Sequence, residues 1–405
     1  MPDEVATGRA GRFGLGQAVA VELVAMAVAI GFYLLPLAEA YAVAAAAVLL
    51  LLVVIGRFGG RWWYEVLGGW LQLHSRRGAG SRAALVARPA GPYWAELAAL
   101  APQLEMRTVV DRNVPVGVGT DELGWFGAIA MTPHDALSRG DGAALRLDWL
   151  ARLAGEPAAP VSAVQVVVRH TPLPSAALDP RSACAKSYQE LREALSVPPH
   201  RDIWIAVRLG LRDAATAAAD YGGDVGGIHR ALAAALSRIS TNLTAHGLAH
   251  RVLDGNELQQ AMVAVYGPDP FEGGPTHVPV TAHETWASWR AVHATHVCFA
   301  VTGWPALNGG GPDALAQLAR VPGALSVCTA VVLGAIRRPG YDEGPVGART
   351  LIRVVASPAT IDGCLTELRA RAGRLGVKLV RLDGEQAAGV YATTPTAAPY
   401  GWGRL

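Results

Sequence analysis

Residues 17–35 read QAVAVELVAMAVAIGFYLL and residues 37–55 read LAEAYAVAAAAVLLLLVVI, with Pro36 between them. Both runs are almost wholly apolar. A helix of about 19 residues is about 28 Å long, close to the roughly 30 Å of a bilayer's hydrocarbon core. The two runs therefore predict a two-helix transmembrane hairpin within residues 1–56, with spans at about 17–35 and 37–55.

Basic residues flank this hairpin on both sides. Arg9 and Arg12 precede the first run, arginines from Arg57 onward follow the second, and residues 35–40 contain none. Because basic residues stay preferentially on the cytoplasmic side, we expect a multi-pass protein of the plasma (inner) membrane with both termini in the cytoplasm. Glu22 lies inside the first run. It either sits near the membrane interface or contacts a helix of a partner subunit.

Residues 57–98 form a segment rich in arginine and tryptophan. Between Trp63 and His74 the apolar residues recur every three or four positions, which is typical of one face of a helix. Such a helix either lies at the headgroups of the lipid bilayer or binds another protein. The candidate membrane-interface or partner-binding residues are Arg57, Arg61, Trp62, Trp63, Trp70, Arg76 and Arg77.

Patterns typical of a cytosolic α/β domain fill residues 99–395, in which we predict a mixed sheet in one domain or two similar lobes. The Pro- and Gly-rich stretch 267–279 is the best internal boundary, and residues 396–405 are a C-terminal tail. A hairpin is expected around residues 121–124. Strands are predicted at 161–171, 203–211, 295–304, 325–337, 348–357, 377–382 and 388–394, and helices at 184–195, 226–246 and 360–373.

Composition and motifs exclude several classes of function. A net charge of +2 with only 17% charged residues argues against a nucleic-acid-binding protein. The chain has no P-loop, no dinucleotide fingerprint after a strand and no nucleophile elbow. Its four cysteines contain no C-x-x-C pair, so zinc-ribbon and thioredoxin motifs are excluded as well.

The remaining polar clusters have ordinary structural interpretations. Residues 222–227 (GGDVGG) are typical of a turn and a helix start, although such a start can also bind an anion. His246 and His250 are four apart, but no acidic third ligand follows nearby, which argues against zinc. His293 and His296 fit packing or surface positions. We therefore predict no catalytic residue, no cofactor and no metal site.

The hairpin, the segment GRFGGRWWYEVLGGWLQLHSRR at residues 56–77 and the strand–helix–strand ending at residues 351–390 resemble EccE. EccE is a membrane component of the mycobacterial type VII (ESX) secretion system, and the resemblance is one of layout over the whole chain. It implies a domain similar in fold to nucleotide-sugar glycosyltransferases without their catalytic residues, and the sequence indeed lacks a D-x-D motif. It also implies the partners EccB, EccC and EccD, with EccC as the ATPase.

Two functional hypotheses follow. The first is a non-enzymatic structural subunit of the ESX core complex, which supports export of WXG100 and PE/PPE proteins. The alternative is a membrane-anchored glycosyltransferase that uses a nucleotide-sugar donor and would need a metal or cationic clamp on the diphosphate. A sensor that couples a cytosolic ligand to the hairpin is a third possibility, motivated by topology alone.

Overall fold

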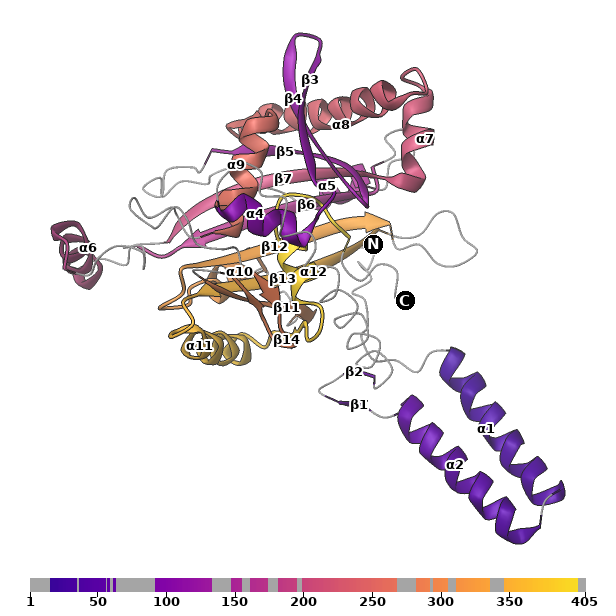
Figure 1. Ribbon diagram of the computed structural model, residues 1–405. Coiled ribbons are helices and arrows are strands. Elements are labelled where there is room, and N and C mark those ends of the chain that lie inside the picture. The colour runs from indigo at the N-terminus through magenta and orange to yellow at the C-terminus, as the bar shows by residue number, and fades with distance from the viewer. Residues whose placement is uncertain are drawn as a thin grey trace, which may run out of the picture.

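The computed structural model describes residues 15–34, 36–55, 57–58, 61–62, 92–132, 147–154, 161–173, 181–194, 199–267, 282–291, 294–304, 311–335 and 346–399 (Figure 1). Its helices are α1 (Leu15–Leu34), α2 (Leu37–Ile55), α4 (Pro92–Leu100), α5 (Leu147–Ala154), α6 (Ala183–Ala194), α7 (Leu211–Ala219), α8 (Val225–Ala245), α9 (Gly255–Tyr266), α10 (Gly311–Leu318), α11 (Ile361–Arg374) and α12 (Gln386–Ala392).

The two N-terminal helices α1 and α2 form a hairpin held by small residues (Figure 1). A methyl group added at Gly31 of α1 would lie 3.2 Å from Cγ1 of Val43 in α2, so the two helices approach closely at this point. Ala40 is buried in the same contact region, and the rings of Phe32 and Tyr41 meet edge to face at 5.6 Å. The predicted pair of helices is thus present.

The prediction that this hairpin crosses a membrane is wrong. Within the described ranges, no helix combines the length and the apolarity that a membrane crossing requires. The prediction rested on the length and apolar composition of the two runs alone. The predicted multi-pass topology rested on these spans and has no support.

A 12-stranded sheet forms the centre of the remaining chain. Its strands are β3 (Glu105–Asp111), β4 (Val114–Asp121), β5 (Gly124–Met131), β6 (Ala163–Thr171), β7 (His200–Gly210), β8 (His250–Val252), β9 (His283–Glu284), β10 (Trp289–Arg290), β11 (Thr295–Gly303), β12 (Ser326–Ala335), β13 (Val346–Ala356) and β14 (Lys378–Arg381). They lie in the order β3-β4-β5-β7-β6-β12-β13-β11-β10-β9, with β8 also paired to β5 and β14 to β11.

Every described pairing in this sheet is antiparallel, so the predicted mixed sheet is also wrong. The reason lies in the connections. Strands that follow one another in the chain, such as β3–β4, β4–β5 and β12–β13, pair directly, and direct neighbours without a crossover helix must be antiparallel. A doubly wound nucleotide-binding sheet is built from parallel βαβ units instead. The described pairings thus give no parallel scaffold for the predicted likeness to glycosyltransferases.

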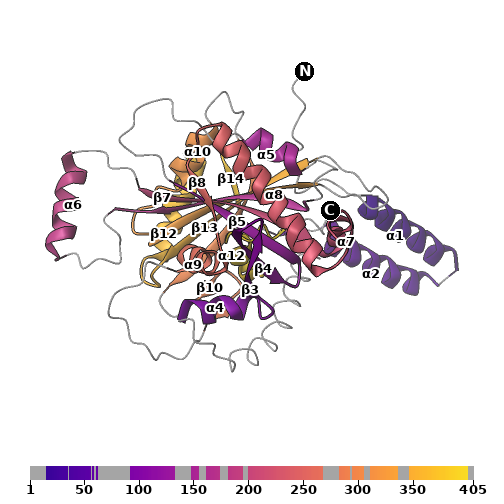
Figure 2. The same cartoon turned by 90° about the horizontal axis from the view of Figure 1, so that it is seen from above.

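Helices cover both faces of the sheet (Figure 2). On one face α5, α7 and α8 pack on the strands of the first half, and α10 and α11 pack on those of the second. On the opposite face, a single apolar cluster joins α4, α9 and α12 to the strands of both halves. The sheet is therefore buried on both faces along its central strands, and polar side chains there must find partners inside the protein.

The domain consists of two halves with the same topology. Strands β5, β6, β7 and β8 follow the same order and pairing as β11, β12, β13 and β14, and helices α5, α8 and α9 correspond to α10, α11 and α12. The halves meet where β6 pairs with β12, so an approximate two-fold axis passes through this pair. Both halves share one sheet.

A short sequence repeat marks the same relation. Residues 253–255 read LDG at the start of α9, and residues 382–384 read LDG just before α12. Each following helix carries a Val-Tyr pair near its end, at 265–266 and at 390–391. The stretch 267–279 lies between the halves in the chain. It falls outside the described residues apart from Gly267, and its role as a boundary stays a prediction.

Most local predictions are confirmed. The strands expected at 161–171, 203–211, 295–304, 325–337, 348–357 and 377–382, and all three helices, appear within a few residues of their predicted bounds. The strand predicted at 388–394 is wrong, because Gln386–Ala392 forms α12. Gly389 lets this helix approach β11 closely, since a methyl group there would lie 2.8 Å from Cβ of Cys298. Tertiary contact thus overrides the strand-like Val-Tyr pattern.

Gly124, at the start of β5, provides a test of this packing. Its φ is +129°, and an added methyl group would lie 2.2 Å from the Leu209 carbonyl oxygen in β7. We expect Gly124→Ala to destabilise the fold by at least about 2 kcal/mol in urea unfolding. The matched control is Gly363→Ala in α11, where the methyl group meets nothing within 4 Å. This control should stabilise the protein by about 0.5–1 kcal/mol, and equal unfolding midpoints for the two variants would contradict the assigned packing.

Candidate functional site

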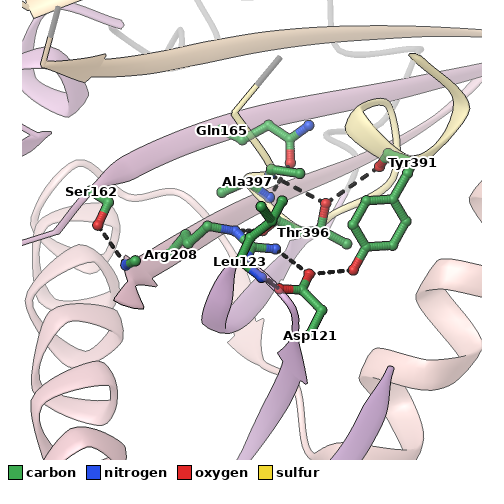
Figure 3. A network of polar contacts seen from close by, with 10 residues as sticks. Asp121, Leu123, Ser162, Gln165, Arg208, Tyr391, Thr396 and Ala397 are labelled. Atoms are coloured by element: carbon green, nitrogen blue, oxygen red, sulfur yellow. Dashed lines mark hydrogen bonds and ion pairs between the residues drawn. The ribbon is translucent and has the colours of Figure 1, made fainter. Parts of the chain in front are cut away.

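A buried ion pair joins strand β4 to strand β7 (Figure 3). Asp121 ends β4 and Arg208 lies near the end of β7, and both side chains are almost wholly buried. The two carboxylate oxygens of Asp121 accept hydrogen bonds from Nη1 and Nη2 of Arg208, each at 2.7 Å. This bidentate arrangement is the strongest form of the arginine–carboxylate pair. The guanidinium also lies over the Phe126 ring, 5.0 Å from its centroid.

The C-terminal segment closes over this pair. The Tyr391 hydroxyl, from α12, donates a hydrogen bond to the second carboxylate oxygen of Asp121 (Figure 3). Nε of Arg208 donates to the Thr396 carbonyl oxygen at 2.9 Å. Gln165 of β6 donates to the Ala392 carbonyl and accepts from the Ala397 backbone nitrogen, both at 2.7 Å. Residues 391–397 are therefore tied to β4, β6 and β7 through polar groups sealed from water.

The charges in this network are fixed by their surroundings. Burial acts to raise the pKa of Asp121, but the hydrogen bonds and positive charge of Arg208, together with the Tyr391 hydroxyl, outweigh it and hold that pKa below its usual value. Burial, and then the negative charge of Asp121, raise the pKa of the Tyr391 hydroxyl well above its usual value. At neutral pH the network thus contains a carboxylate, a guanidinium and a protonated phenol.

This arrangement suits stabilisation rather than chemistry. The donors of Arg208 and the acceptors of Asp121 are used by one another and by the C-terminal segment, so no reacting group faces solvent. General acid–base catalysis requires a group within hydrogen-bond reach of a substrate. We call the network of Asp121, Arg208, Tyr391 and Gln165 the C-terminal clasp. We interpret it as a set of buried polar contacts that holds the second half against the first.

The glycine-rich stretch 222–227 and the histidines His246 and His250 form hydrogen bonds within the protein. Asp224 caps α8 by accepting a hydrogen bond from the Gly227 backbone nitrogen at 2.6 Å, so a carboxylate of the chain already occupies that helix start. His246 hydrogen bonds the Asn242 carbonyl oxygen, and His250 hydrogen bonds Ser240. In the part of the chain that the structure describes, no group of three or more potential ligands is placed to hold a metal ion.

The predicted interface residues are only partly described. Arg57 lies in β1 (Arg57–Phe58), and Arg61 and Trp62 form β2 (Arg61–Trp62), which pairs antiparallel with β1. This short hairpin was not predicted. Trp63, Trp70, Arg76 and Arg77, with the predicted amphipathic helix, lie outside the described residues. The interface role of all seven residues stays a prediction.

The exposed surface of α1 is apolar. Glu22 is exposed, and beside it Leu23, Met26 and Ile30 are 59%, 55% and 51% exposed. Their spacing of three and four residues places these three side chains on one face of the helix. A cluster of large exposed aliphatic groups is typical of a surface that another apolar surface covers. The contact of Glu22 with a partner helix is not tested by this arrangement.

Residues 197–301 match the family described as "Putative type VII ESX secretion system translocon, EccE". This match supports the assignment of the chain to the EccE family. The predicted resemblance is thereby confirmed, and the protein is a component of a type VII secretion system. No curated protein matches the chain.

The matched segment lies in the middle of the domain's sequence. It runs from the start of β7 through α7, α8, β8 and α9 into β11, and so includes Arg208 of the C-terminal clasp. Asp121 and Tyr391, the partners of Arg208, lie on either side of it in the sequence. The clasp therefore connects the matched segment to both flanking parts of the chain.

Asp121 offers a pH-dependent test of the clasp. Its pKa in the folded state is lower than the usual value of 3.8, so its contribution is complete above about pH 4 and is lost as the pH falls through the folded pKa. Asp121→Asn leaves Arg208 buried without its counter-charge, and we expect a loss of about 3–5 kcal/mol near neutral pH. This loss should shrink below about pH 4 in urea unfolding. The exposed Asp220→Asn should change stability by less than about 0.5 kcal/mol, and a pH-independent effect of Asp121→Asn would contradict the pairing.

Tyr391→Phe tests the hydroxyl alone. The variant keeps the ring and removes one hydrogen bond to a carboxylate, so we expect a loss of about 1.5–3 kcal/mol in the free energy of unfolding. In the Asp121→Asn background the same change should cost much less, because its acceptor is altered. Strictly additive effects would show that the two groups do not interact.

Proposed function

We propose that this EccE chain is a non-enzymatic structural subunit of the membrane-associated type VII core complex, in which it supports export of WXG100 and PE/PPE proteins. Its proposed partners are EccB, EccC and EccD, with EccC as the ATPase. The observation that carries the proposal is the EccE match at residues 197–301. The clasp is consistent with it, because its polar groups are buried and bonded to one another.

The exposed face of α1 supports a contact with other subunits. Burial of apolar area contributes about 25 cal/mol per Å², so covering side chains as large as Leu23, Met26 and Ile30 stabilises an assembly by several kcal/mol. The packing of α1 on α2 through Gly31 and Ala40 leaves this face uncovered. We therefore propose that the α1 face, with Glu22 at its edge, docks on apolar helices of another component.

The assembly test uses the tagged full-length chain in its native host. Gentle detergent extraction, a blue-native gel and mass spectrometry should find it in one large complex with an FtsK-like ATPase and further subunits. Replacing Leu23, Met26 and Ile30 together by serine should release the chain from that complex. Serine keeps helix formation possible and removes the apolar area on which the contact depends.

The matched control changes an equally exposed apolar surface elsewhere. Val110 and Val114 flank the turn between β3 and β4 and are 68% and 51% exposed. Their double serine variant should assemble as the unchanged chain does. A wild-type chain that migrates alone would refute the proposed function. Retained assembly of the α1 variant would refute the role of the α1 face only.

A further inference from the structure

Two arginines lie beside a buried histidine at one end of the junction between the halves. His170 of β6 is directly opposite Arg201 of β7 on one side and Val327 of β12 on the other. Residues directly opposite one another in an antiparallel pair point to the same face of the sheet, with Cβ atoms about 4.5–5.5 Å apart. The side chains of His170 and Arg201 are therefore neighbours.

Arg320 approaches the same place from the second half. It follows α10 and precedes Val321, which packs in one apolar cluster with Val327. Because Val327 is paired with His170, this packing brings Arg320 close to the ring. Its positive charge and that of Arg201 both act on the His170 imidazole. The three groups thus come from β6, β7 and the segment after α10.

The neighbouring acid serves the opposite face of the sheet. Asp202 follows Arg201 in β7, so its side chain points the other way. There one carboxylate oxygen lies 3.5 Å from Nη1 of Arg169, and the other lies 3.1 Å from Nε2 of His200. Arg201 and Arg320 are both exposed, and neither forms an ion pair with a residue that the structure describes. Two guanidinium groups on this face therefore lack a described counter-charge.

The imidazole of His170 is neutral and has an unused proton. The residue is only 4% exposed, and burial, followed by the charges of Arg201 and Arg320, lowers its pKa to about 4. Nδ1 is sealed from water and has no hydrogen-bond partner in the described chain. Buried N–H groups without an acceptor are rarer than buried acceptors without a donor. The proton therefore lies on Nε2, which has no described acceptor either.

This combination of groups favours an anion with several oxygen atoms. Hydrogen bonds from a guanidinium to an oxyanion are stronger than those between neutral groups, and the arginine fork matches phosphate well. Donors that come from three elements suit a tetrahedral ion, because its oxygens point in several directions, whereas a carboxylate has only two in one plane. Both arginines lie at the surface, so such a ligand requires no buried cavity.

We propose that Arg201, Arg320 and Nε2 of His170 form a surface binding site for a phosphate group. The arginines supply the positive charge, and His170 supplies a neutral donor that the sheet holds in place. The site lies near the opposite end of β6 and β7 from Arg208 of the C-terminal clasp. Since Arg320 belongs to the second half and the other two residues to the first, the bound phosphate bridges the halves there.

Titration with inorganic phosphate tests the site in the purified full-length protein at neutral pH and constant ionic strength. We expect the phosphorus NMR resonance of phosphate to shift saturably. Arg201→Gln and Arg320→Gln each remove one charged donor and should weaken binding about tenfold. Both positions are exposed, so the variants should fold. The matched control is Arg212→Gln, an exposed arginine of α7, which should leave the affinity unchanged.

The ring of His170 provides a second readout, which general attraction of ions to the surface would not move. Phosphate bound to Arg201 and Arg320 offsets their charges, so the pKa of His170, about 4 without ligand, should rise. Proton–nitrogen NMR of the ring measures this pKa, and loss of the signal in His170→Gln identifies it. The ring signals of the exposed His246 should not respond to phosphate.

Vesicles distinguish a lipid headgroup from a soluble phosphate compound. The double variant Arg201→Gln/Arg320→Gln and the unchanged chain are sedimented with vesicles of phosphatidic acid or of phosphatidylcholine. Phosphate binding together with weaker sedimentation of the variant on phosphatidic acid alone identifies a headgroup site. Phosphate binding with equal sedimentation of both proteins identifies a site for a soluble phosphate compound. Absence of a saturable phosphate shift, or equal affinity in the two single arginine variants and the unchanged chain, would overturn the proposal.

Discussion

The pairing of β6 with β12 is the contact on which the rest of the domain depends. It runs from Ala163 opposite Gly334 to His170 opposite Val327 and joins two halves of the same topology into one sheet. Two strands paired only with each other would each have an outer edge with unpaired backbone groups, and such edges can pair with other chains. Here each central strand has a second neighbour, β7 or β13, so the junction is enclosed on both sides.

Helices α9 and α12, which carry Tyr266 and Tyr391, add further contacts between the two halves. Tyr391 of α12 hydrogen bonds Asp121, the partner of Arg208 in the first half. Arg353 of β13, in the second half, donates a hydrogen bond to the Val265 carbonyl oxygen in α9. Each half thus covers a buried arginine of the other. Buried polar networks specify one arrangement strongly, because any other arrangement leaves charges without partners. The shared apolar cluster under α4, α9 and α12 contributes the larger, non-directional part of the stability. The arginines decide which arrangement that cluster adopts.

The match at residues 197–301 relates the centre of this domain to a component of a type VII secretion system. The α1–α2 hairpin adds an apolar surface that the described residues leave uncovered. The buried ion pair and this exposed apolar surface thus lie in different parts of the chain.

The sequence by itself determined the local elements and the family. The alternation of Ile203, Ile205, Val207 and Leu209 fixed a strand, and the long runs before residue 56 fixed two helices, because these signals depend only on neighbouring residues. Arg208 alternates with these residues and therefore lies on the opposite face of the strand. Trp204 and Ala206 on that face were the available signal that it is buried too.

Only the tertiary structure decided which polar residues meet. Asp121, Arg208 and Tyr391 lie far apart in the chain, and nothing local distinguishes them from surface residues of the same types. The helix at Gln386–Ala392 likewise forms against a strand-like pattern, because Gly389 packs on Cys298. The spacing of residues in the sequence predicts only contacts within one helix or strand. Contacts between elements follow from the order of strands in the sheet, which brings distant residues together inside a buried interior.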